Sequence, residues 1–592
     1  MRKKIGLILR KAMGGDAEVS IPENEKFGHY STNVAMKLAR GKKAAPRQRG
    51  EPCPAGRGNS LELAAELAAK IEKSAPAGFF EKVEVAAPGF INLWVSKKIL
   101  RDELVSIFRQ KERYGRSDVG RKKKVIVEYS SVNVAKPMHV GHLRSTVIGD
   151  ALANVLEFAG YKVIRWNYVG DWGTQFGKLI AAYKRWGRKS EVEKSPIGEL
   201  LSLYVRFHKK EVENPIFLKE GQEEFMKLEA GDKENRKLWR WFSKESMEEF
   251  KKVYGILGVK FDVVLGESFF EPFLKPLVER LYKKKIATES EGALVVNFDK
   301  FSAKKGLPPA LVQKSDESSL YLTRDIANLE YRIKKYKPSG IIYVVGNEQA
   351  LHFEQLFAIA GIIRLKNTKL AHVKYGLVLG EKGKKLSTRG GEAIQLEELL
   401  RKSVGLAGKI VEQKNPKLKA REKNAIAEAV GVGAVKYNDL KENRMSDIYF
   451  DWDKMLDFSG DSAPYIQYTH ARLRSILRKA HKASGIQYPS FAKASVGKQV
   501  SSLDTDIEMA LIRKIAEFPE TVRRSAENFF TNNIARYLYE LANLANKYYE
   551  STPILTDKNV DRRNVRLMLI NSVAVVIKNG LGLLGIKAPE KI

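Results

Sequence analysis

Cysteine is almost absent from this sequence of 592 residues, in which Cys53 is the only one. A single thiol cannot close an internal disulfide, and it cannot supply the several cysteine ligands of a structural zinc site. Chains without a disulfide framework are typical of a reducing compartment. The sequence therefore predicts a cytoplasmic protein without protein-bound zinc.

Long apolar runs are scarce as well. We find no run that approaches the roughly 20 apolar residues needed to span a bilayer, which argues against a membrane protein. The start, MRKKIGLILRKAMGG, is basic but lacks the apolar segment and the small-residue cleavage site of a signal peptide. Residues 1–15 are instead predicted to form an amphipathic helix.

Acidic residues are in short supply relative to basic ones. There are 70 Asp and Glu against 104 Lys and Arg, which leaves a formal net charge of +34. With 44% hydrophobic residues the chain can build several packed cores, so the basic excess should lie on folded surfaces. This charge favours nucleic acid as a partner, with an anionic membrane as the weaker alternative. At roughly 150 residues per domain, the length predicts about three to five domains.

The N-terminal region has the pattern of a small α/β domain, which we assign to residues 1–115. Residues 61–73 have helical spacing of Leu and Ala, and residues 83–95 have strand-like content that is interrupted at Pro88-Gly89. Residues 41–59 are rich in Gly, Pro and Arg and predict an exposed, flexible loop. A solvated insertion is favoured there over an RNA contact.

A strand, loop, helix and strand follow one another between residues 124 and 169. KVIVEYS and KVIRWNYV are β-branched runs, and between them apolar residues recur at helical spacing from His142 to the stop at Gly160. This order predicts a βαβ unit with parallel strands. We therefore expect a Rossmann-like α/β core with a parallel sheet over residues 120–400.

The remaining segments extend that core. Residues 190–290 are charged and mostly helical in pattern, and we interpret them as an insertion. Short β-branched runs at 293–298, 341–346 and 375–380 predict that the parallel sheet resumes. From about Leu396 the pattern is almost entirely helical, so residues 401–592 are predicted to form an all-α bundle.

The most informative stretch is EYSSVNVAKPMHVGHLRSTVIGD, residues 128–150. His139 and His142 lie where the strand gives way to a helix, and a helix N-terminus favours phosphate through its free N–H groups and its dipole. Gly141 leaves room for a close approach. Taken alone, this short motif could also be a chance occurrence or a pair of packed histidines.

The motif resembles the His-Ile-Gly-His signature of class I aminoacyl-tRNA synthetases. With the segment GYKVIRWNYVGDWGTQFG, it resembles the arginyl-tRNA synthetase family in particular. The resemblance continues in order through residues 320–332, 344–357, 384–400, 437–456 and 463–477, so that it covers nearly the whole chain. It implies ATP-dependent ligation of L-arginine to tRNA through an arginyl-adenylate, a tRNA-contacting N-terminal domain and an anticodon-binding C-terminal bundle.

The second class I signature departs from the usual Lys-Met-Ser-Lys-Ser. Here Thr388 occupies the place of the second lysine in KLSTR, and the resemblance implies that Lys136, just before the histidine motif, supplies the missing charge. The implied catalytic set is His139, Gly141, His142, Lys136, Lys385 and Ser387. The alternative for the second loop is a solvated basic turn.

An arginine substrate needs carboxylates for its guanidinium group and polar groups for its α-amino end. Asp325 and Tyr321 are four residues apart and would share one face of a helix. The resemblance implies that arginine is contacted by Ser131, Asn133, Tyr321, Asp325 and Gln349. Glu128 is a further acidic candidate. Each alone could equally be a helix cap or a surface ion pair, and Trp166, Asp171 and Trp172 are interpreted as pocket walls or structural residues.

The first C-terminal helices combine aromatic and basic residues, a mixture that stacks on bases and holds phosphates. The resemblance implies tRNA binding by Tyr465, Gln467, Tyr468, Arg472 and Arg474. The alternative is that the tyrosines are core residues and the arginines a solvated face. We expect ATP with Mg²⁺, L-arginine and tRNA as ligands, and a monomer.

Two other functions are disfavoured by the sequence. A class I synthetase for another amino acid is disfavoured because the chain has no cysteine-based zinc site and no insertion as large as an editing domain. A catalytically silent RNA-binding relative is disfavoured because both histidines and Lys136 are present, although Thr388 keeps it open.

Overall fold

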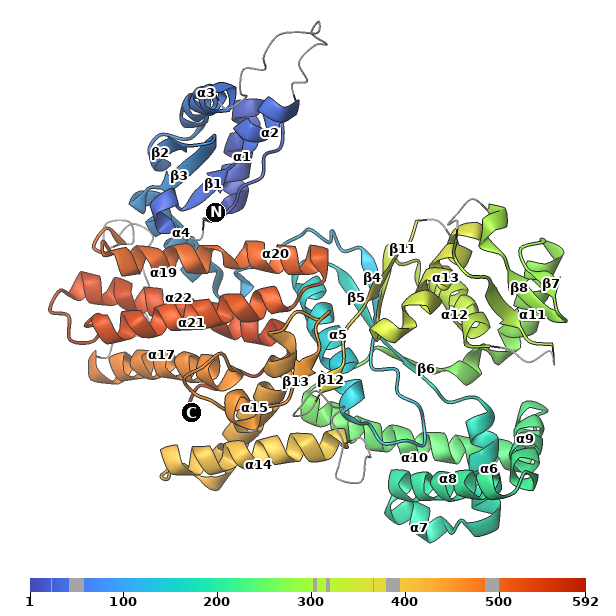
Figure 1. Cartoon of the computed structure of the whole chain (residues 1–592). Helices are drawn as coiled ribbons and strands as arrows, with labels where there is room; N and C mark the ends of the chain where they lie inside the picture. The colour runs from blue at the N-terminus through green and yellow to red at the C-terminus, as the bar shows by residue number, and fades with distance from the viewer. Residues whose placement is uncertain are drawn as a thin grey trace, which may run out of the picture.

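The computed structural model describes residues 1–22, 24–41, 58–301, 306–315, 320–365, 367–379, 394–484 and 500–592. Figure 1 shows three regions: an N-terminal domain, a central α/β core that carries a helical insertion, and a helical bundle. The N-terminal domain packs on the bundle, and the core lies beside the bundle, with the helical insertion below it reaching the bundle through α10.

The N-terminal domain is a three-stranded antiparallel sheet, in the order β1-β3-β2, covered by helices. The predicted helix and the interruption at Pro88-Gly89 are confirmed, because that dipeptide lies in the turn between β2 and β3. The elements are α1 (Arg2–Met13), η1 (Glu25–Phe27), β1 (Tyr30–Thr32), α2 (Val34–Gly41), α3 (Gly58–Ser74), β2 (Phe80–Ala86), β3 (Phe90–Val95), α4 (Lys97–Gln110) and η2 (Lys111–Arg113).

The core is a five-stranded parallel sheet in the order β11-β10-β4-β5-β6, as the Rossmann-like prediction requires. From β4 the chain adds β5 and then β6 on one side of the sheet, and it later adds β10 and β11 on the other side of β4. The carboxyl ends of β4 and β10 therefore form the switch point where such sheets bind ligands. The strands are β4 (Lys124–Glu128), β5 (Lys162–Val169), β6 (Val263–Gly266), β10 (Gly340–Val344) and β11 (Lys369–Val373).

Helices cover both faces of this sheet, which explains its continuous apolar runs. One face packs on α5 (Val140–Phe158), and the other packs on α12 (Tyr321–Tyr336) and α13 (Ala350–Ile362). The far side of α5 packs against the bundle, so α5 is buried along nearly its whole length. Lys436 of the bundle joins this contact: its Nζ lies 3.7 Å from Asp150 of α5 and donates to the carbonyl of Gly585 at 2.8 Å.

Two of the predicted core strands lie elsewhere. Residues 293–298 contribute to a separate antiparallel sheet of β7 (Thr288–Ser290), β8 (Ala293–Val296) and β9 (Ala310–Gln313). Residues 375–380 contribute β12 (Val378–Leu379), which pairs with β13 (Ile448–Tyr449). The prediction was wrong because a short β-branched run does not reveal which sheet it joins.

The insertion is mostly helical, but it does not fill residues 190–290 as predicted, because β6 of the core sheet lies within that range. Its helices enclose an apolar core of their own that includes Trp172, Phe207 and Phe242. The helices are α6 (Thr174–Trp186), α7 (Lys189–Lys194), α8 (Pro196–Glu213), α9 (Ile216–Glu229) and α10 (Lys233–Leu257). Between β6 and β10 lie η3 (Glu267–Phe270), α11 (Glu271–Lys283) and η4 (Phe298–Phe301), and η5 (Asn347–Gln349) follows β10.

The C-terminal part is the predicted helical bundle. Its last helix is long and apolar enough to cross a membrane by length and composition alone, although charged and amide residues interrupt its apolar runs. However, 72% of its most apolar window is buried, because this helix packs against its neighbours in the bundle. The helices are α14 (Leu396–Lys414), α15 (Ala420–Leu440), α16 (Trp452–Met455), α17 (Ala463–Ser484), α19 (Asp506–Ala516), α20 (Phe518–Asn528), α21 (Asn532–Ser551) and α22 (Val560–Leu583).

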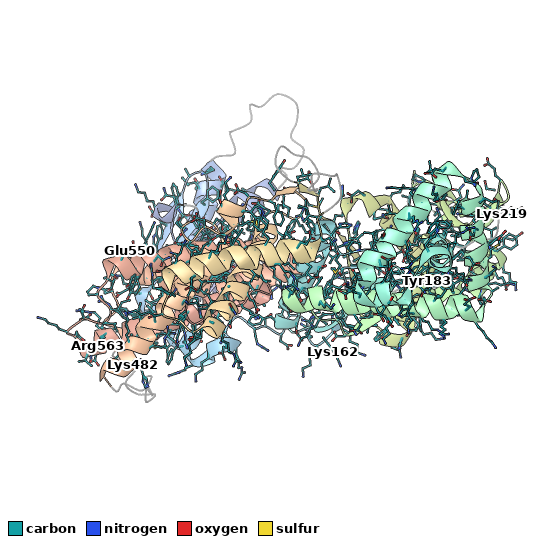
Figure 2. All side chains as sticks on the ribbon, turned by 90° about the horizontal axis from the view of Figure 1, so that it is seen from below. Lys162, Tyr183, Lys219, Lys482, Glu550 and Arg563 are labelled. Atoms are coloured by element: carbon teal, nitrogen blue, oxygen red, sulfur yellow. The ribbon has the colours of Figure 1, made fainter. Side chains whose placement is uncertain are left out.

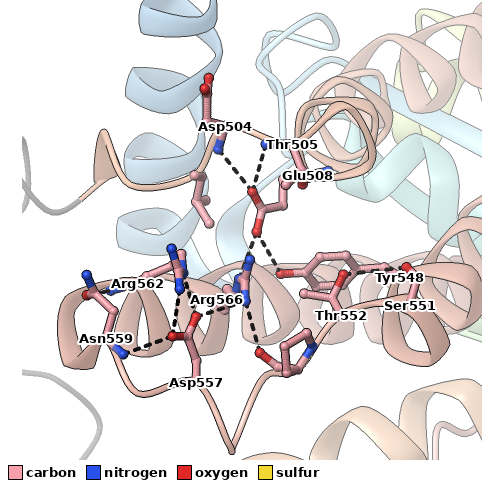
Figure 3. A network of polar contacts seen from close by, with 12 residues as sticks. Asp504, Thr505, Glu508, Tyr548, Ser551, Thr552, Asp557, Asn559, Arg562 and Arg566 are labelled. Carbon is pink, nitrogen blue, oxygen red and sulfur yellow. Dashed lines mark hydrogen bonds and ion pairs between the residues drawn. The ribbon is translucent and has the colours of Figure 1, made fainter.

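A buried ionic network, which we call the bundle network, joins α19 to α22 (Figure 3). The Nε of Arg566 donates to Glu508 at 2.8 Å, and its Nη1 donates to Asp557 at 2.9 Å. Arg562 donates to both oxygens of Asp557. The other oxygen of Glu508 accepts the backbone N–H groups at the start of α19, so the network also caps that helix.

Charged side chains project along the whole length of the molecule. Figure 2 shows Lys482 and Arg563 at the end of the bundle and Lys219 at the end of the insertion. The excess of basic residues therefore reaches both ends of the molecule and is not confined to one site.

Candidate active site

The two histidines of the signature cap the start of α5. The Nδ1 of His139 accepts a hydrogen bond from the N–H of Gly141 at 3.1 Å, and the Nδ1 of His142 accepts one from the N–H of His139 at 3.1 Å. Their ring centres are 4.0 Å apart. The two rings thus form one fixed pair at a helix N-terminus.

Both histidines are neutral near pH 7. Burial lowers the pKa of His142 to about 3, and burial with the nearby charge of Lys136 lowers the pKa of His139. A neutral ring whose Nδ1 accepts a hydrogen bond must carry its proton on Nε2. Both rings therefore keep an Nε2–H donor for a ligand.

Gly141 is required by the histidine pair. A Cβ at this position would lie 2.7 Å from Cε1 of His139, closer than side-chain carbons approach. The space that the glycine leaves is therefore filled by the ring of His139 in this structure.

A cleft of about 540 Å³ opens beside the pair at the switch point. It brings together the start of α5, the turn after β10 and the segment that leads into β12, which are far apart in the sequence. The lining residues are His139, Val140, Gly141, His142, Arg144, Gly346, Glu348, Gln349, Tyr375, Gly376, Leu377 and Val378. Arg144 ties one wall to α5, because its Nη1 donates to the carbonyl of Ser446 in the segment that pairs with β12.

Of the predicted catalytic lysines, Lys136 lies in the described part of the chain and Lys385 does not. Nζ of Lys136 lies 5.3 Å from the ring centre of Tyr204 in α8, yet its charge reaches His139 and lowers the pKa of that ring. Lys385 and Ser387 lie outside the residues that the structure describes, as does most of the 41–59 loop.

Buried and partly buried acidic residues gather where α12, α13 and η3 meet the sheet, and we call this group the acidic pocket: Glu128, Asp171, Glu267 and Asp325. Asp325 lies 2.6 Å from Nε2 of His352 in α13. Asp171 accepts the backbone N–H of Ser268 at 2.9 Å and its hydroxyl at 2.7 Å. Glu128 forms a fully buried ion pair with Arg332, whose guanidinium lies 4.3 Å from the ring centre of Trp166.

Glu267 is the carboxylate with the least compensation. It is 9% exposed, its Oε2 has no hydrogen-bond partner, and its ion pair with Arg324 is long at 3.7 Å. Burial raises the pKa of Glu267 to about 8 against the opposing charge of Arg324, and the neighbouring carboxylate of Asp325 adds to the rise. A cation placed beside Glu267 would restore its charge.

Other buried polar atoms near the carboxyl ends of β4 and β5 also lack partners. These are the hydroxyl groups of Tyr168 and Ser131. The loop after β4 is conformationally strained, with φ values of 73° at Ser130, 50° at Ser131 and 63° at Ala135. Unpaired buried groups and backbone strain concentrate at functional sites, where a ligand completes the hydrogen bonds.

The structure therefore brings most of the predicted arginine contacts to one region. Asn133, Tyr321 and Gln349 are exposed, with Tyr321 at 64%. Glu128 already has a cationic partner in Arg332, so its charge is compensated. Trp166 is buried in the core between the sheet and helices α12 and α13, whereas Trp172 belongs to the core of the insertion.

Glu267 was missed in the sequence. It lies within the range assigned to a helical insertion, although the run VVLG just before it is a strand of the parallel sheet. A carboxylate directly after a parallel strand is the signal that could have identified it.

The predicted RNA-contacting residues differ in accessibility. Gln467 is fully buried and its amide donates to the carbonyls of Ala429 and Lys587, so it is not available to RNA in this conformation, contrary to the prediction. Tyr465 donates to Asn543, and Arg474 is paired with Glu590. Arg472 is half-buried and lies over Tyr468 at 4.8 Å and over Tyr549 at 5.1 Å.

No group of three or more His, Cys, Asp and Glu side chains is arranged to hold a metal ion within the described ranges. The carboxylate that lines the described part of the cleft is Glu348.

Three sequence families match the chain. "Arginyl tRNA synthetase N terminal domain" matches residues 1–95, "tRNA synthetases class I (R), catalytic domain" matches residues 103–452, and "DALR anticodon binding domain" matches residues 466–592. Together they cover all three regions of the structure.

Relatives match over almost the full length. The chain is 42% identical over 576 residues to the arginine–tRNA ligase of Streptococcus thermophilus, covering 97% of this chain and 95% of that protein. The enzyme of Clostridioides difficile is 39% identical over 581 residues, with 98% and 96% covered. The solved arginyl-tRNA synthetase of Thermus thermophilus superposes with a TM-score of 0.81 at 26% identity, and that of Plasmodium falciparum with 0.79 at 28%, each covering 100% of this chain and 99% of the other. This chain belongs to the arginyl-tRNA synthetase family, within class I of the aminoacyl-tRNA synthetases.

Proposed function

We propose that this protein ligates L-arginine to its cognate tRNA at the expense of ATP, through an arginyl-adenylate. Two observations carry the proposal: a buried carboxylate, Glu267, whose Oε2 accepts no hydrogen bond, and a pair of neutral histidines at a helix N-terminus. The first feature suits the guanidinium of arginine, and the second suits a phosphate.

The first step joins arginine to AMP. An oxygen of the arginine carboxylate attacks the α-phosphate, and the bond to pyrophosphate breaks. His139 and His142 donate through Nε2 to the phosphate oxygens as negative charge builds up there, while Lys136 and the unplaced Lys385 and Ser387 act on the leaving pyrophosphate. Mg²⁺ bound with ATP would neutralise part of the pyrophosphate charge. This is catalysis by positioning and electrostatics, without a covalent enzyme intermediate.

Glu267 and Asp325 bind the guanidinium of arginine. Glu267 has an unpaired buried oxygen, and Asp325 is held by a histidine instead of an arginine. Ser131, Asn133 and Gln349 contact the α-amino end, since Gln349 lines the histidine cleft and the Ser131 hydroxyl lacks a partner. Tyr321 closes the exposed end of the pocket, and Glu128 acts through its ion pair with Arg332.

The second step transfers the arginyl group to a hydroxyl of the terminal adenosine of tRNA, and AMP leaves. Tyr468 and Arg472 are the accessible bundle contacts, with Tyr465 and Arg474 at their edge, while residues 1–115 contact a second part of the tRNA. Residues 120–400 act as the catalytic unit and residues 401–592 as the anticodon-binding unit. We propose in addition a monomeric protein, and a cytoplasmic one because a lone cysteine suits a reducing compartment.

The test is ATP–pyrophosphate exchange with each amino acid, with and without tRNA, followed by transfer of labelled amino acid to tRNA. Arginine alone should support both. Exchange with another amino acid would indicate a different class I synthetase, and no exchange under either condition would indicate a silent relative. For Lys136, the Lys136→Ala variant should lose exchange far more than tRNA affinity, and an equal loss of both would remove it from the first step.

A further inference from the structure

The contact between His352 and Asp325 joins two helices at the proposed arginine site. Nε2 of His352, in the first turn of α13, lies 2.6 Å from Oδ2 of Asp325 in the first turns of α12. Both side chains are about four-fifths buried, at 22% and 21% exposure. The hydrogen bond is therefore short and largely shielded from water, which strengthens it.

Asp325 is the carboxylate of this region that is paired with a histidine. Glu128 is paired with Arg332, and Glu271 accepts a hydrogen bond from Arg324 at 2.8 Å. Both of those partners are permanent cations. His352 is instead a titratable partner: burial opposes its charge, but the hydrogen bond and charge of Asp325 raise the pKa of His352 above its ordinary value.

The contact also leaves one oxygen of Asp325 open. Oδ2 accepts from His352, and Oδ1 accepts no hydrogen bond from any residue in the described part of the chain. Gln349, the last residue of η5 and the N-cap of α13, lies three residues before His352 and lines the histidine cleft. A single rigid helical segment thus fixes both a wall of the ATP cleft and the orientation of Asp325.

We propose that His352 is a positioning residue for arginine: it holds Asp325 by its Oδ2 so that Oδ1 is directed at the substrate guanidinium. The inference rests on the proposed arginine site. His352 does not touch the substrate or the reacting phosphate, and it acts on affinity for arginine through Asp325.

The experiment compares three variants of the full-length protein in ATP–pyrophosphate exchange. His352→Leu removes the donor, His352→Gln keeps an N–H donor at a similar reach, and Asp325→Asn removes the charge itself. Gln355→Ala is the matched control, since Gln355 lies one turn further along α13 and binds only the carbonyls of Pro308 and Pro309. KM for arginine, KM for ATP and kcat are measured for each, and thermal unfolding shows that each is folded.

We expect His352→Leu to raise KM for arginine about 10- to 100-fold, the cost of a lost hydrogen bond to a charged group. KM for ATP should stay the same and kcat should change much less. His352→Gln should restore most of the arginine affinity, a rescue that a packing role alone would not give. Gln355→Ala should behave as the unaltered protein.

The outcomes separate this inference from the proposed function. An unchanged KM for arginine in His352→Leu, beside a raised value in Asp325→Asn, overturns the positioning role alone. Equal rises in both KM values, or no rescue by His352→Gln, also overturn it, because the residue would then only support packing. An unchanged arginine KM in Asp325→Asn overturns the arginine site and this inference with it. If His352→Leu does not fold, His352→Gln against Asp325→Asn decides in the same way.

Discussion

The bundle network and the acidic pocket are both buried clusters of charge, and they differ in how fully their hydrogen bonds are satisfied. In the bundle network, all four carboxylate oxygens of Glu508 and Asp557 accept hydrogen bonds from protein donors (Figure 3). In the acidic pocket, Glu267 keeps an oxygen without any. A satisfied cluster rigidifies a fold, whereas an unsatisfied one is open to a ligand.

The difference extends to ionisation. Hydrogen bonds from Arg562 lower the pKa of Asp557 to about 2, but burial raises the pKa of Glu267 to about 8. Both carboxylates have an arginine nearby, so the presence of a cation does not decide the outcome. The balance between burial, which dominates at Glu267, and hydrogen bonds, which dominate at Asp557, decides it. This balance distinguishes the cluster that stabilises the bundle from the one that is prepared for substrate.

The largest expected effect is on stability, in the bundle network. Arg566→Met leaves Glu508 and Asp557 buried without their shared partner, and breaking such a pair costs about 3–5 kcal/mol. Calorimetric unfolding should show this loss for the bundle, while KM for arginine at low temperature stays the same. Arg563→Met is the control, because the neighbouring Arg563 takes part in none of these bonds. A loss below about 1 kcal/mol would show that the network is not the structural cluster we describe.

The next effect is on substrate affinity, in the acidic pocket. Glu267→Gln removes the charge that the guanidinium would meet, and we expect KM for arginine to rise about 100-fold, or close to 3 kcal/mol. Stability at pH 7 should not fall, because a carboxyl group with a pKa of about 8 is mostly protonated at that pH and glutamine is a neutral group of similar size. Glu330→Gln, a carboxylate paired with Arg280 at the surface, should change neither quantity. Unfolding at a lower temperature with unchanged KM would reverse the roles of the two clusters.

A smaller effect is expected from pH. The pKa of Glu267 is about 8 in the free protein and 4.5 in an unfolded chain. Arginine binds the ionised form, so binding releases a proton below pH 8. Affinity should therefore rise by up to about tenfold per pH unit towards pH 8 and then level off. Over the same range the stability of the free protein should fall, because the folded state keeps a proton that the unfolded state has lost. Calorimetric titrations at several pH values measure both, and a dependence that persists in Glu267→Gln would contradict the assignment.

The smallest effects come from two buried tyrosines. Tyr548 donates to Glu508 at 3.4 Å, so Tyr548→Phe should cost about 0.5–1 kcal/mol. The hydroxyl of Tyr168 has no partner, so Tyr168→Phe should be neutral or slightly stabilising in the absence of arginine. Chemical unfolding of both variants compares them directly. A larger loss for Tyr168→Phe than for Tyr548→Phe would mean that the pocket is satisfied after all.

The sequence predicted the parts of the fold that have strong local patterns. The βαβ unit, the helical bundle and the N-terminal helix at 61–73 are confirmed because apolar spacing and turn residues agree there. It did not predict β6 and β11, which are short edge strands of four and five residues. Edge strands carry little apolar signal of their own, and their membership in a sheet is decided by distant pairing.

The candidate site could be predicted in part, again where the sequence has a strong local pattern. His139 and His142 lie in a local motif, and Asp325 and Tyr321 share a helix. Glu267 was hidden because its role depends on burial and on a missing partner, which no local pattern records. Gln467 shows the opposite error: its neighbours suggest an RNA contact, but the carbonyls of Ala429 and Lys587, remote in the sequence, bind its amide.

The buried contact of Lys436 has a consequence for synthesis of the protein. α5 is made early, yet Lys436, which faces Asp150 on α5, receives its carbonyl partner only when Gly585 has left the ribosome. Until then an ammonium group in an apolar interface lacks part of its compensation. The interface between α5 and the bundle therefore needs the last part of the chain, so it is completed late in synthesis.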